Sequence, residues 1–275
     1  MLIKDWQDAV RTLEMSHGPT YYVDVGSGPA VVLLHGVSFT GGAHEWFQNV
    51  EALAANFRVI APDFVGWGRG GRLERSYSFA RLVDFVREFQ DRLEIASSHI
   101  VGHSMGGWVA SLLAYESPQR VERLVLVGSG GVGQRPLKMM TEFSPPSLED
   151  AQAALAARTG LDRAEVCEWA EYGWRNVQSA RAAESYLKIM RHMSDPETRA
   201  IYNTIRRLPH ISAPTLVLWG SHDEVNELEL GRETARLVPD STLAVLDCGH
   251  FVPTQRPAEF NQHVGTFLAT GHIDG

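Results

Sequence analysis

Short, uninterrupted apolar segments alternate along this chain with longer segments in which apolar residues recur every three or four positions. Segments 30–34, 58–61, 124–127, 215–219 and 243–246 are of the first kind, and segment 79–93 is a clear example of the second. Continuous apolar strands suit a sheet buried on both faces, and their alternation with amphipathic helices is typical of parallel sheets. The sequence therefore predicts an α/β fold with a mostly parallel central sheet and helices on both faces.

The alternation stops between residues 131 and 208. This stretch is polar, has a helical pattern, and carries Pro145-Pro146 near its start and Pro209 just after its end. Helices inserted between two core strands are expected to cover the carboxyl-terminal edge of the sheet, where open α/β sheets bind ligands. We therefore predict a core domain made of residues 1–130 and 209–275 and a helical lid made of residues 131–208.

A glycine-rich turn joins one of these strands to the helix that follows it. The turn has the sequence Gly102-His103-Ser104-Met105-Gly106, which fits the pattern G-x-S-x-G. A serine on such a sharp turn has strained backbone geometry, and glycines are needed where a Cβ atom would collide. The pattern predicts that Ser104 is a nucleophile, whereas the alternative is a glycine-rich turn with an incidental serine. His103, its neighbour, is assigned either a structural role or a place on the pocket wall.

A serine nucleophile needs a histidine base and an acidic residue that orients it, in the chain order serine, acid, histidine. Asp223 follows the strand 215–219 and His250 follows the strand 243–246, so both are expected at the same edge of the sheet as the serine. His222 and Glu224 flank Asp223 and are rival assignments at that position. Asp247 is too near His250 in sequence to orient its ring easily.

Catalysis by an alkoxide also requires two N–H groups that stabilise the oxyanion. The residue after the nucleophile supplies one of them, which here is Met105. The other comes from the loop after the second strand, which reads His35-Gly36-Val37. Gly36 lets the chain turn so that the Val37 amide faces the site, although the same dipeptide would also simply end a strand.

Five motifs occur in the order in which α/β-hydrolase fold enzymes carry them. They are His35-Gly36, Asp63-x-x-Gly66-x-Gly68, Gly102-x-Ser104-x-Gly106, Gly220-x-x-Asp223 and Gly249-His250. Over residues 21–268 the chain resembles that family, which implies Ser104 as nucleophile, Asp223 as acid, His250 as base, and the Val37 and Met105 amides as the oxyanion hole. The resemblance implies a structural role for the Asp63 loop. It also implies that a lidded hydrolase of this size is often a homodimer.

Within the family, the chain resembles lidded hydrolases that cleave carbon–carbon bonds in aromatic ring-fission products, and also small esterases and enol-lactonases. The carbon–carbon hydrolases imply an arginine in the lid, and residues 166–174 offer no match for it. The candidate pocket residues share an apolar or aromatic character or a place beside the nucleophile; they are Gly36, His103, Trp108, Met139, Trp169, Trp174 and Phe251. Ordinary packing within the lid is the competing interpretation for the tryptophans and methionines.

Charge and cysteine content limit the partners and the compartment. The chain carries 25 Lys and Arg against 33 Asp and Glu, a formal charge of −8, which argues against nucleic acid or an anionic membrane as a partner. Its two cysteines, Cys167 and Cys248, are too few for a metal site and are predicted to be free thiols. The charged N-terminus argues against a signal peptide, and no segment reaches the length of a membrane span. We expect a cytoplasmic protein with a small-molecule substrate.

Together these patterns predict a serine hydrolase that needs no cofactor or metal. Its substrate would be a small, largely apolar carbonyl compound: a carboxylic ester, a lactone, or a ring-fission diketone cleaved at a carbon–carbon bond. Two alternatives remain open because a fold does not determine a reaction. One is a lyase or cofactor-free oxygenase on the same scaffold, and the other is a ligand receptor with a vestigial triad.

Overall fold

The computed structural model describes residues 1–74, 76–133 and 142–273, and within them one sheet of eight strands forms the centre of the molecule. The strands are β1 (Val10–Met15), β2 (Gly18–Val25), β3 (Ala30–Leu34), β4 (Arg58–Pro62), β5 (Ser98–His103), β6 (Val121–Val127), β7 (Thr215–Gly220) and β8 (Ser241–Leu246). Their order is β1-β2-β4-β3-β5-β6-β7-β8. The strand β2 pairs antiparallel with both β1 and β4, and every other neighbouring pair, including those of β3, is parallel. The predicted fold class, a mostly parallel sheet in an α/β fold, is confirmed.

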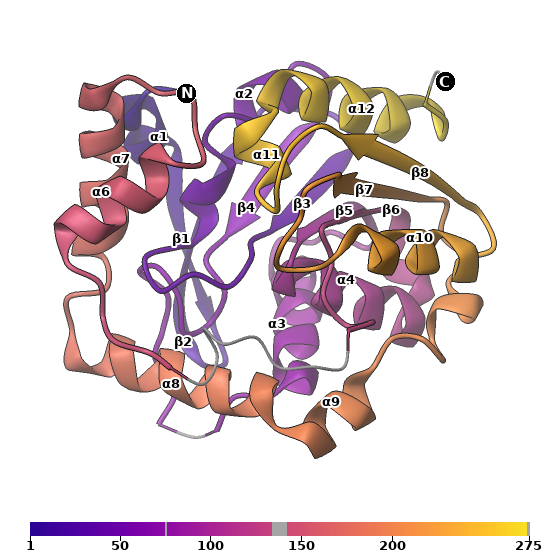
Figure 1. The fold of residues 1–275 in the computed structure, drawn as a ribbon, viewed down its shortest axis with the longest axis horizontal. Helices are drawn as coiled ribbons and strands as arrows, with labels where there is room; N and C mark the ends of the chain where they lie inside the picture. Colours follow the sequence, from indigo (N-terminus) through magenta and orange to yellow (C-terminus); the bar gives the residue numbers. More distant parts are fainter. Residues whose placement is uncertain (75, 134–141, 274–275) are drawn as a thin grey trace.

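Helices cover both faces of the sheet (Figure 1). On one face lie α2 (Val50–Ala54), α11 (Val252–Gln255) and α12 (Pro257–Thr270), and on the other lie α3 (Phe79–Arg92), α4 (Met105–Glu116) and α10 (Leu228–Leu237). The remaining described elements are α1 (Ile3–Ala9), η1 (Ala43–Trp46), η2 (Pro118–Arg120), α6 (Leu148–Ala156), α7 (Arg163–Arg175), α8 (Ala180–Ser194), α9 (Pro196–Tyr202) and η3 (Leu208–His210).

The central strands supply side chains to two separate cores. In β3, Val31 and Leu33 join the core beneath α2 and α12, whereas Val32 and Leu34 join the core beneath α3 and α4. All four side chains are completely buried. Because successive side chains of a strand point to opposite faces, a strand covered on both sides must be apolar throughout. This requirement explains the uninterrupted apolar segments of the sequence.

Two features of the sheet were not predicted from the sequence. Residues 26–29 join β2 directly to β3, but the two strands do not pair, because β4 lies between them in the sheet. The partner of β2 in the hairpin is instead β1, which the apolar pattern does not reveal. The reason is that β1 is an edge strand in which Arg11, Thr12 and Glu14 are exposed, so polar residues interrupt its apolar pattern.

The described helices between β6 and β7 lie over one end of the sheet. In α7, Trp169 packs against Phe47 and Trp6 of the core, with ring centroids 4.5 and 5.7 Å apart. In α8, Tyr186 lies 5.4 Å from Phe39, which belongs to the loop after β3. The division of the chain into a core of residues 1–130 and 209–275 and a lid of residues 131–208 stays a prediction. None of the described helices is both long and apolar enough to span a bilayer.

Candidate functional site

Ser104 occupies the turn between β5 and α4, in the strained geometry that the sequence predicts. Its φ and ψ angles are 53° and −113°, a combination that residues with a side chain rarely adopt. A Cβ atom at Gly102 would collide with the Gly106 backbone, and one at Gly106 would collide with the carbonyl oxygens of Leu34 and His35. The two glycines are therefore required by the close approach of β3, β5 and α4, and the predicted steric reason for the motif is confirmed.

His250 and Asp223 lie beside this serine, although the three residues are far apart in sequence. The His250 Nε2 atom is 2.9 Å from the Ser104 hydroxyl, and its Nδ1 atom is 2.8 Å from Asp223 Oδ2. The Asp223 side chain is completely shielded from solvent and that of His250 is 6% exposed. Each residue follows the carboxyl end of a parallel strand (β5, β7 and β8), so the register of the sheet brings the three side chains to one edge.

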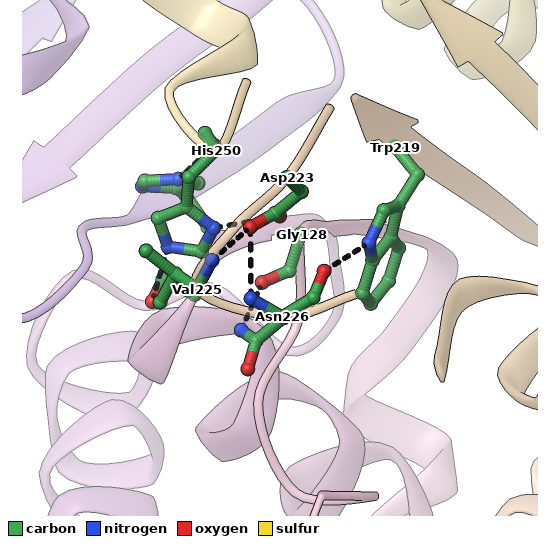
Figure 2. Close-up of polar contacts among 8 residues, drawn as sticks. Gly128, Trp219, Asp223, Val225, Asn226 and His250 are labelled. Carbon is green, nitrogen blue, oxygen red and sulfur yellow. Dashed lines mark hydrogen bonds and ion pairs between the residues drawn. The ribbon is translucent and has the colours of Figure 1, made fainter. Parts of the chain in front are cut away.

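A network of hydrogen bonds holds the Asp223 carboxylate in place (Figure 2). Its Oδ1 atom accepts from the backbone N–H groups of Val225 and Asn226, both at 2.8 Å. The Asn226 side chain donates to the Gly128 carbonyl, and the Asn226 carbonyl accepts from the Trp219 indole, again at 2.8 Å each. One carboxylate oxygen is thus committed to the turn, and the other is free for the histidine.

The rival assignments for the acid lie elsewhere. His222 and Asp247 are exposed and face each other, with 2.9 Å between Nε2 and Oδ1. Glu224 is also exposed. Neither carboxylate therefore orients the His250 ring.

The loop after β3 passes directly beside Ser104. A Cβ atom at Gly36 would lie 3.2 Å from Ser104 Cβ and 3.0 Å from His103 Nδ1, so only glycine fits there without displacement. The amides of Val37 and Met105 have no hydrogen-bond acceptor within the described part of the chain. Met105 is the first residue of α4, where an N–H group without an intrahelical partner is expected and negative charge is favoured.

His35 keeps this loop in place. Its Nδ1 atom donates to the Gly36 carbonyl at 2.8 Å, and its Nε2 atom accepts from the Phe64 N–H at 3.0 Å. Burial lowers the pKa of His35 to about 4, opposed by the bond to Gly36. The ring is therefore neutral at pH 7, which the pair of hydrogen bonds requires.

Asp63 has the structural role that the family resemblance implies. Its carboxylate accepts from the backbone N–H groups of Ala43 at 2.7 Å and Arg69 at 3.0 Å, and so ties the loop after β3 to the loop after β4. Gly68 packs against it so closely that a Cβ atom there would collide with the carboxylate. Burial raises the pKa of Asp63, and the two N–H groups oppose this shift.

A cavity of about 590 Å³, including its mouth, lies next to the triad. Its apolar wall includes Trp46, Phe47, Leu155 and Trp169. His103 and Phe251, the immediate sequence neighbours of Ser104 and His250, also line it, although the latter two do not. Of the predicted pocket residues, His103, Trp169 and Phe251 therefore lie on this cavity. A largely apolar cavity with a few polar groups is typical of a small-molecule site.

The other predicted pocket residues lie elsewhere. Trp108 is buried in the core beneath the sheet, 4.1 Å from the Phe79 ring, and its indole donates to the Tyr202 carbonyl. Trp174 donates to the Pro146 carbonyl, also between β6 and β7, and does not line the cavity. Both tryptophans satisfy their N–H groups in packing contacts, which is the competing interpretation of the sequence pattern. Met139 lies outside the described residues.

Two charged residues on the cavity wall, Glu45 and Arg158, were not predicted from the sequence as site residues. His44, for which a place in the pocket and ordinary packing were both open, lines the same wall. The Arg158 guanidinium lies 4.6 Å from the Phe251 ring centroid, and its Nε atom is buried without a hydrogen-bond partner in the described chain. Arg158 comes from the segment between α6 and α7, outside the range 166–174 in which a lid arginine was sought. The only signal for Glu45 was its position shortly after the His35-Gly36 motif.

Burial affects the ionisation of these groups. It lowers the pKa of His44 to about 3 and raises that of Glu45, with Arg158 opposing the shift at Glu45. Burial also lowers the pKa of Arg158, opposed by Glu45. His103 has a pKa well below its usual value because of burial and the nearby His250.

Within the described residues, no group of three or more His, Cys, Asp and Glu side chains is arranged to hold a metal ion. Cys167 and Cys248 are both free thiols, as predicted. Burial raises the pKa of the Cys248 thiol to about 11, so this thiol is not activated.

Comparisons with known proteins bear on the fold and on the class of reaction. A family model described as the alpha/beta hydrolase fold matches residues 29–257. The chain is 31% identical over 264 residues to a 2-hydroxy-6-oxo-6-phenylhexa-2,4-dienoate hydrolase of Burkholderia cepacia, covering 90% of each chain. It is 28% identical to the solved structure of a meta-cleavage product hydrolase of Pseudomonas fluorescens, with a TM-score of 0.82 over 95% of this chain and 98% of that one. An enol-lactonase structure from Burkholderia xenovorans, at 23% identity, shares the fold with a TM-score of 0.76 over 94% of this chain and 100% of that one.

Proposed function

The chain belongs to the α/β-hydrolase fold family and is a hydrolase, and from this premise we propose that Ser104, His250 and Asp223 form its catalytic triad. The observation that carries the proposal is the unbroken pair of contacts from Asp223 through His250 to the serine hydroxyl, at 2.8 and 2.9 Å. His250 Nδ1 donates its proton to Asp223, so Nε2 is left as the acceptor for the Ser104 proton.

The reaction would begin with attack of Ser104 Oγ on a substrate carbonyl carbon while its proton passes to His250 Nε2. The carbonyl oxygen then becomes an oxyanion, which the N–H groups of Val37 and Met105 would stabilise. When the intermediate collapses, the bond to the leaving group breaks and His250 returns the proton to that group. Water then repeats the sequence on the acyl-enzyme and restores the free serine.

For the substrate we propose an aromatic ring-fission diketone that carries a carboxylate, cleaved at a carbon–carbon bond. The relative in Burkholderia cepacia is named for such a compound, a phenylhexadienoate. The wall of Trp46, Phe47 and Trp169 would receive an apolar or aromatic part. Arg158 would receive the carboxylate, because a guanidinium binds carboxylates well and this one has no ion-pair partner in the described chain.

A small neutral ester or lactone is the second candidate substrate. The specific observation in its favour is the apolar wall formed by Trp46, Phe47, Leu155 and Trp169, which suits the acyl chain of an ester as well as an aromatic ring.

Parallel assays with 2-hydroxy-6-oxo-6-phenylhexa-2,4-dienoate and p-nitrophenyl butyrate test both parts of the proposal. Ser104→Ala should abolish turnover of either compound without a change in melting temperature, and a fluorophosphonate should label the wild-type serine stoichiometrically. Arg158→Gln should raise KM for the dienoate and leave KM for the neutral ester unchanged. Undiminished turnover in Ser104→Ala would refute the nucleophile and favour a lyase or oxygenase reaction.

A further inference from the structure

The side chain of Glu45 is placed where the substrate of the proposed hydrolase would bind, although the triad does not use it. Glu45 belongs to the short helix η1 and lines the 590 Å³ cavity. Its Oε2 atom accepts from the Gly36 N–H at 3.3 Å. Gly36 in turn packs against Ser104, since a Cβ atom there would lie 3.2 Å from that of the serine. Gly36 therefore contacts the Glu45 carboxyl group through its N–H group and packs against the nucleophile.

The surroundings of Glu45 favour its neutral form. Within the described chain its side chain makes no ion pair, and the one hydrogen bond of the carboxyl group there is the long contact with Gly36. A buried carboxylate without a paired cation is costly. Burial accordingly raises the pKa of Glu45, against the opposing influence of Arg158, the Gly36 N–H and His250.

The charged and titratable groups that face Glu45 come from several elements. Arg158 approaches from the segment after α6, His250 from the loop after β8, and Tyr186 from α8. His44 and His103 stand on the same cavity wall, and burial keeps both rings neutral at pH 7. Arg158 is thus the one permanent cation in this described set, and no Glu45 oxygen forms an ion pair with it.

A neutral Glu45 has two distinct oxygens. The carbonyl-type oxygen can accept the Gly36 N–H, and the hydroxyl is then left to donate. An ionised carboxylate at this place would instead repel the oxyanion that forms on the substrate beside Gly36 and Val37. The neutral form is therefore the one that is compatible with the proposed chemistry.

We propose that Glu45 is a further catalytic residue, whose carboxylic acid donates a hydrogen bond to a second oxygen of the substrate, close to the scissile carbonyl. This inference rests on the proposed function and narrows the class of substrate that the enzyme would take. The substrate would carry an acceptor oxygen on the cavity side of its reacting carbon, such as the oxygen of a second carbonyl group. The proton stays on Glu45 throughout, because His250 moves the proton of the nucleophile and of the leaving group.

Three variants test this role: Glu45→Gln, Glu45→Ala, and Glu168→Gln as a matched control at an exposed lid carboxyl group. Steady-state kinetics with the phenylhexadienoate and with p-nitrophenyl butyrate would run from about pH 6 to about pH 9. Glu45→Gln should stay within ~3-fold of wild type, since an amide also offers one acceptor and a donor. Glu45→Ala should lose ~10²-fold in kcat on the dienoate, the usual cost of one such donor.

The pH profile separates donation from mere positioning of the Gly36 amide. Wild type should lose activity on the alkaline side as Glu45 ionises, whereas Glu45→Gln should lack this loss because an amide does not ionise. Glu45→Ala should keep the melting temperature of Glu168→Gln.

Two results would overturn the role of Glu45. One is Glu45→Gln falling as low as Glu45→Ala, and the other is an alkaline limb that Glu45→Gln shares with wild type. Fluorophosphonate labelling keeps this outcome distinct from failure of the hydrolase proposal. If Ser104 of the wild-type protein is labelled and this protein turns over substrate, either of the two results above shows that only the role of Glu45 is wrong. If wild type is neither labelled nor active on either compound, the triad and the Glu45 role both fall.

Discussion

Replacing Asp223 by asparagine should remove most of the activity and little of the stability. The carboxylate has two separate tasks, because Oδ1 accepts from the turn at Val225 and Asn226 and Oδ2 contacts His250. An asparagine has nearly the same shape but only one acceptor oxygen. The two backbone N–H groups of the turn hold that oxygen, so the amide NH₂ group must face the His250 ring.

The consequence for catalysis follows from the ring proton. With an NH₂ group opposite, His250 Nδ1 has to accept, and the proton moves to Nε2, which then donates to Ser104 and cannot take its proton. In enzymes that use this triad, the same change costs ~10⁴-fold in kcat. This corresponds to about 5 kcal/mol of transition-state stabilisation. Asp223→Ala should be equally inactive but less stable, by about 1 kcal/mol for each turn hydrogen bond that it loses.

The assay compares kcat on p-nitrophenyl butyrate with urea unfolding for both variants. Asp247→Asn serves as the control. Asp247 directly follows the neighbouring strand β8, and its exposed carboxylate contacts His222. This control should keep wild-type kcat. If Asp223→Asn kept more than about a tenth of the wild-type kcat, the idea that Asp223 sets the tautomer of His250 would be refuted.

Three further predictions concern stability and positioning. Because the pKa of His35 falls from 6.5 to about 4 on folding, the unfolded chain binds more protons below pH 6.5, and the free energy of unfolding should fall by about 3 kcal/mol as pH drops from about 6.5 to about 4. Urea unfolding should show a smaller drop in His35→Gln, and equal drops in both proteins would contradict the assignment. Gly128→Ala should lower kcat by up to ~10²-fold. Gly128 has a φ of 47°, and a Cβ atom there would lie 3.2 Å from both Asp223 Oδ2 and His250 Nδ1. A wild-type kcat in this variant would show that the triad tolerates the displacement. Trp108→Ala should lower the free energy of unfolding by about 3–5 kcal/mol, because Trp108 is a buried core residue. Trp169→Ala should mainly raise KM, because Trp169 lines the cavity. A raised KM in Trp108→Ala together with an unchanged KM in Trp169→Ala would refute the placement of the cavity.

The sequence alone predicts the fold class and the residues around which the site is built. Apolar strands such as Ala30–Leu34 must be buried on both faces, so their pattern already implies helices on each side of a parallel sheet. The glycines around Ser104 imply a sharp turn, because no other residue fits so close to a neighbouring backbone. Local constraints of this kind act within a few residues, and a sequence records them directly.

Residues that meet only through the sheet are harder to find. Asp223 and His250 were identified because each follows a strand, and parallel strands end at a common edge. Trp108 and Trp169 have the same chemical character in the sequence, yet one fills the core and the other lines the cavity. Which way a tryptophan faces depends on the packing of helices against the sheet, and helical spacing does not report it.

The polar side of the cavity was decided entirely by tertiary structure. Arg158 and Glu45 are separated by more than a hundred residues and belong to no motif, but the packing of distant segments places both on the wall that contains His103 and Phe251. Long side chains on such segments have no preferred partner until the segments pack together. The apolar strands and the strain at Ser104 follow from short-range sequence patterns and backbone sterics, whereas the order of the strands and the charges that face a substrate follow from how distant segments pack together.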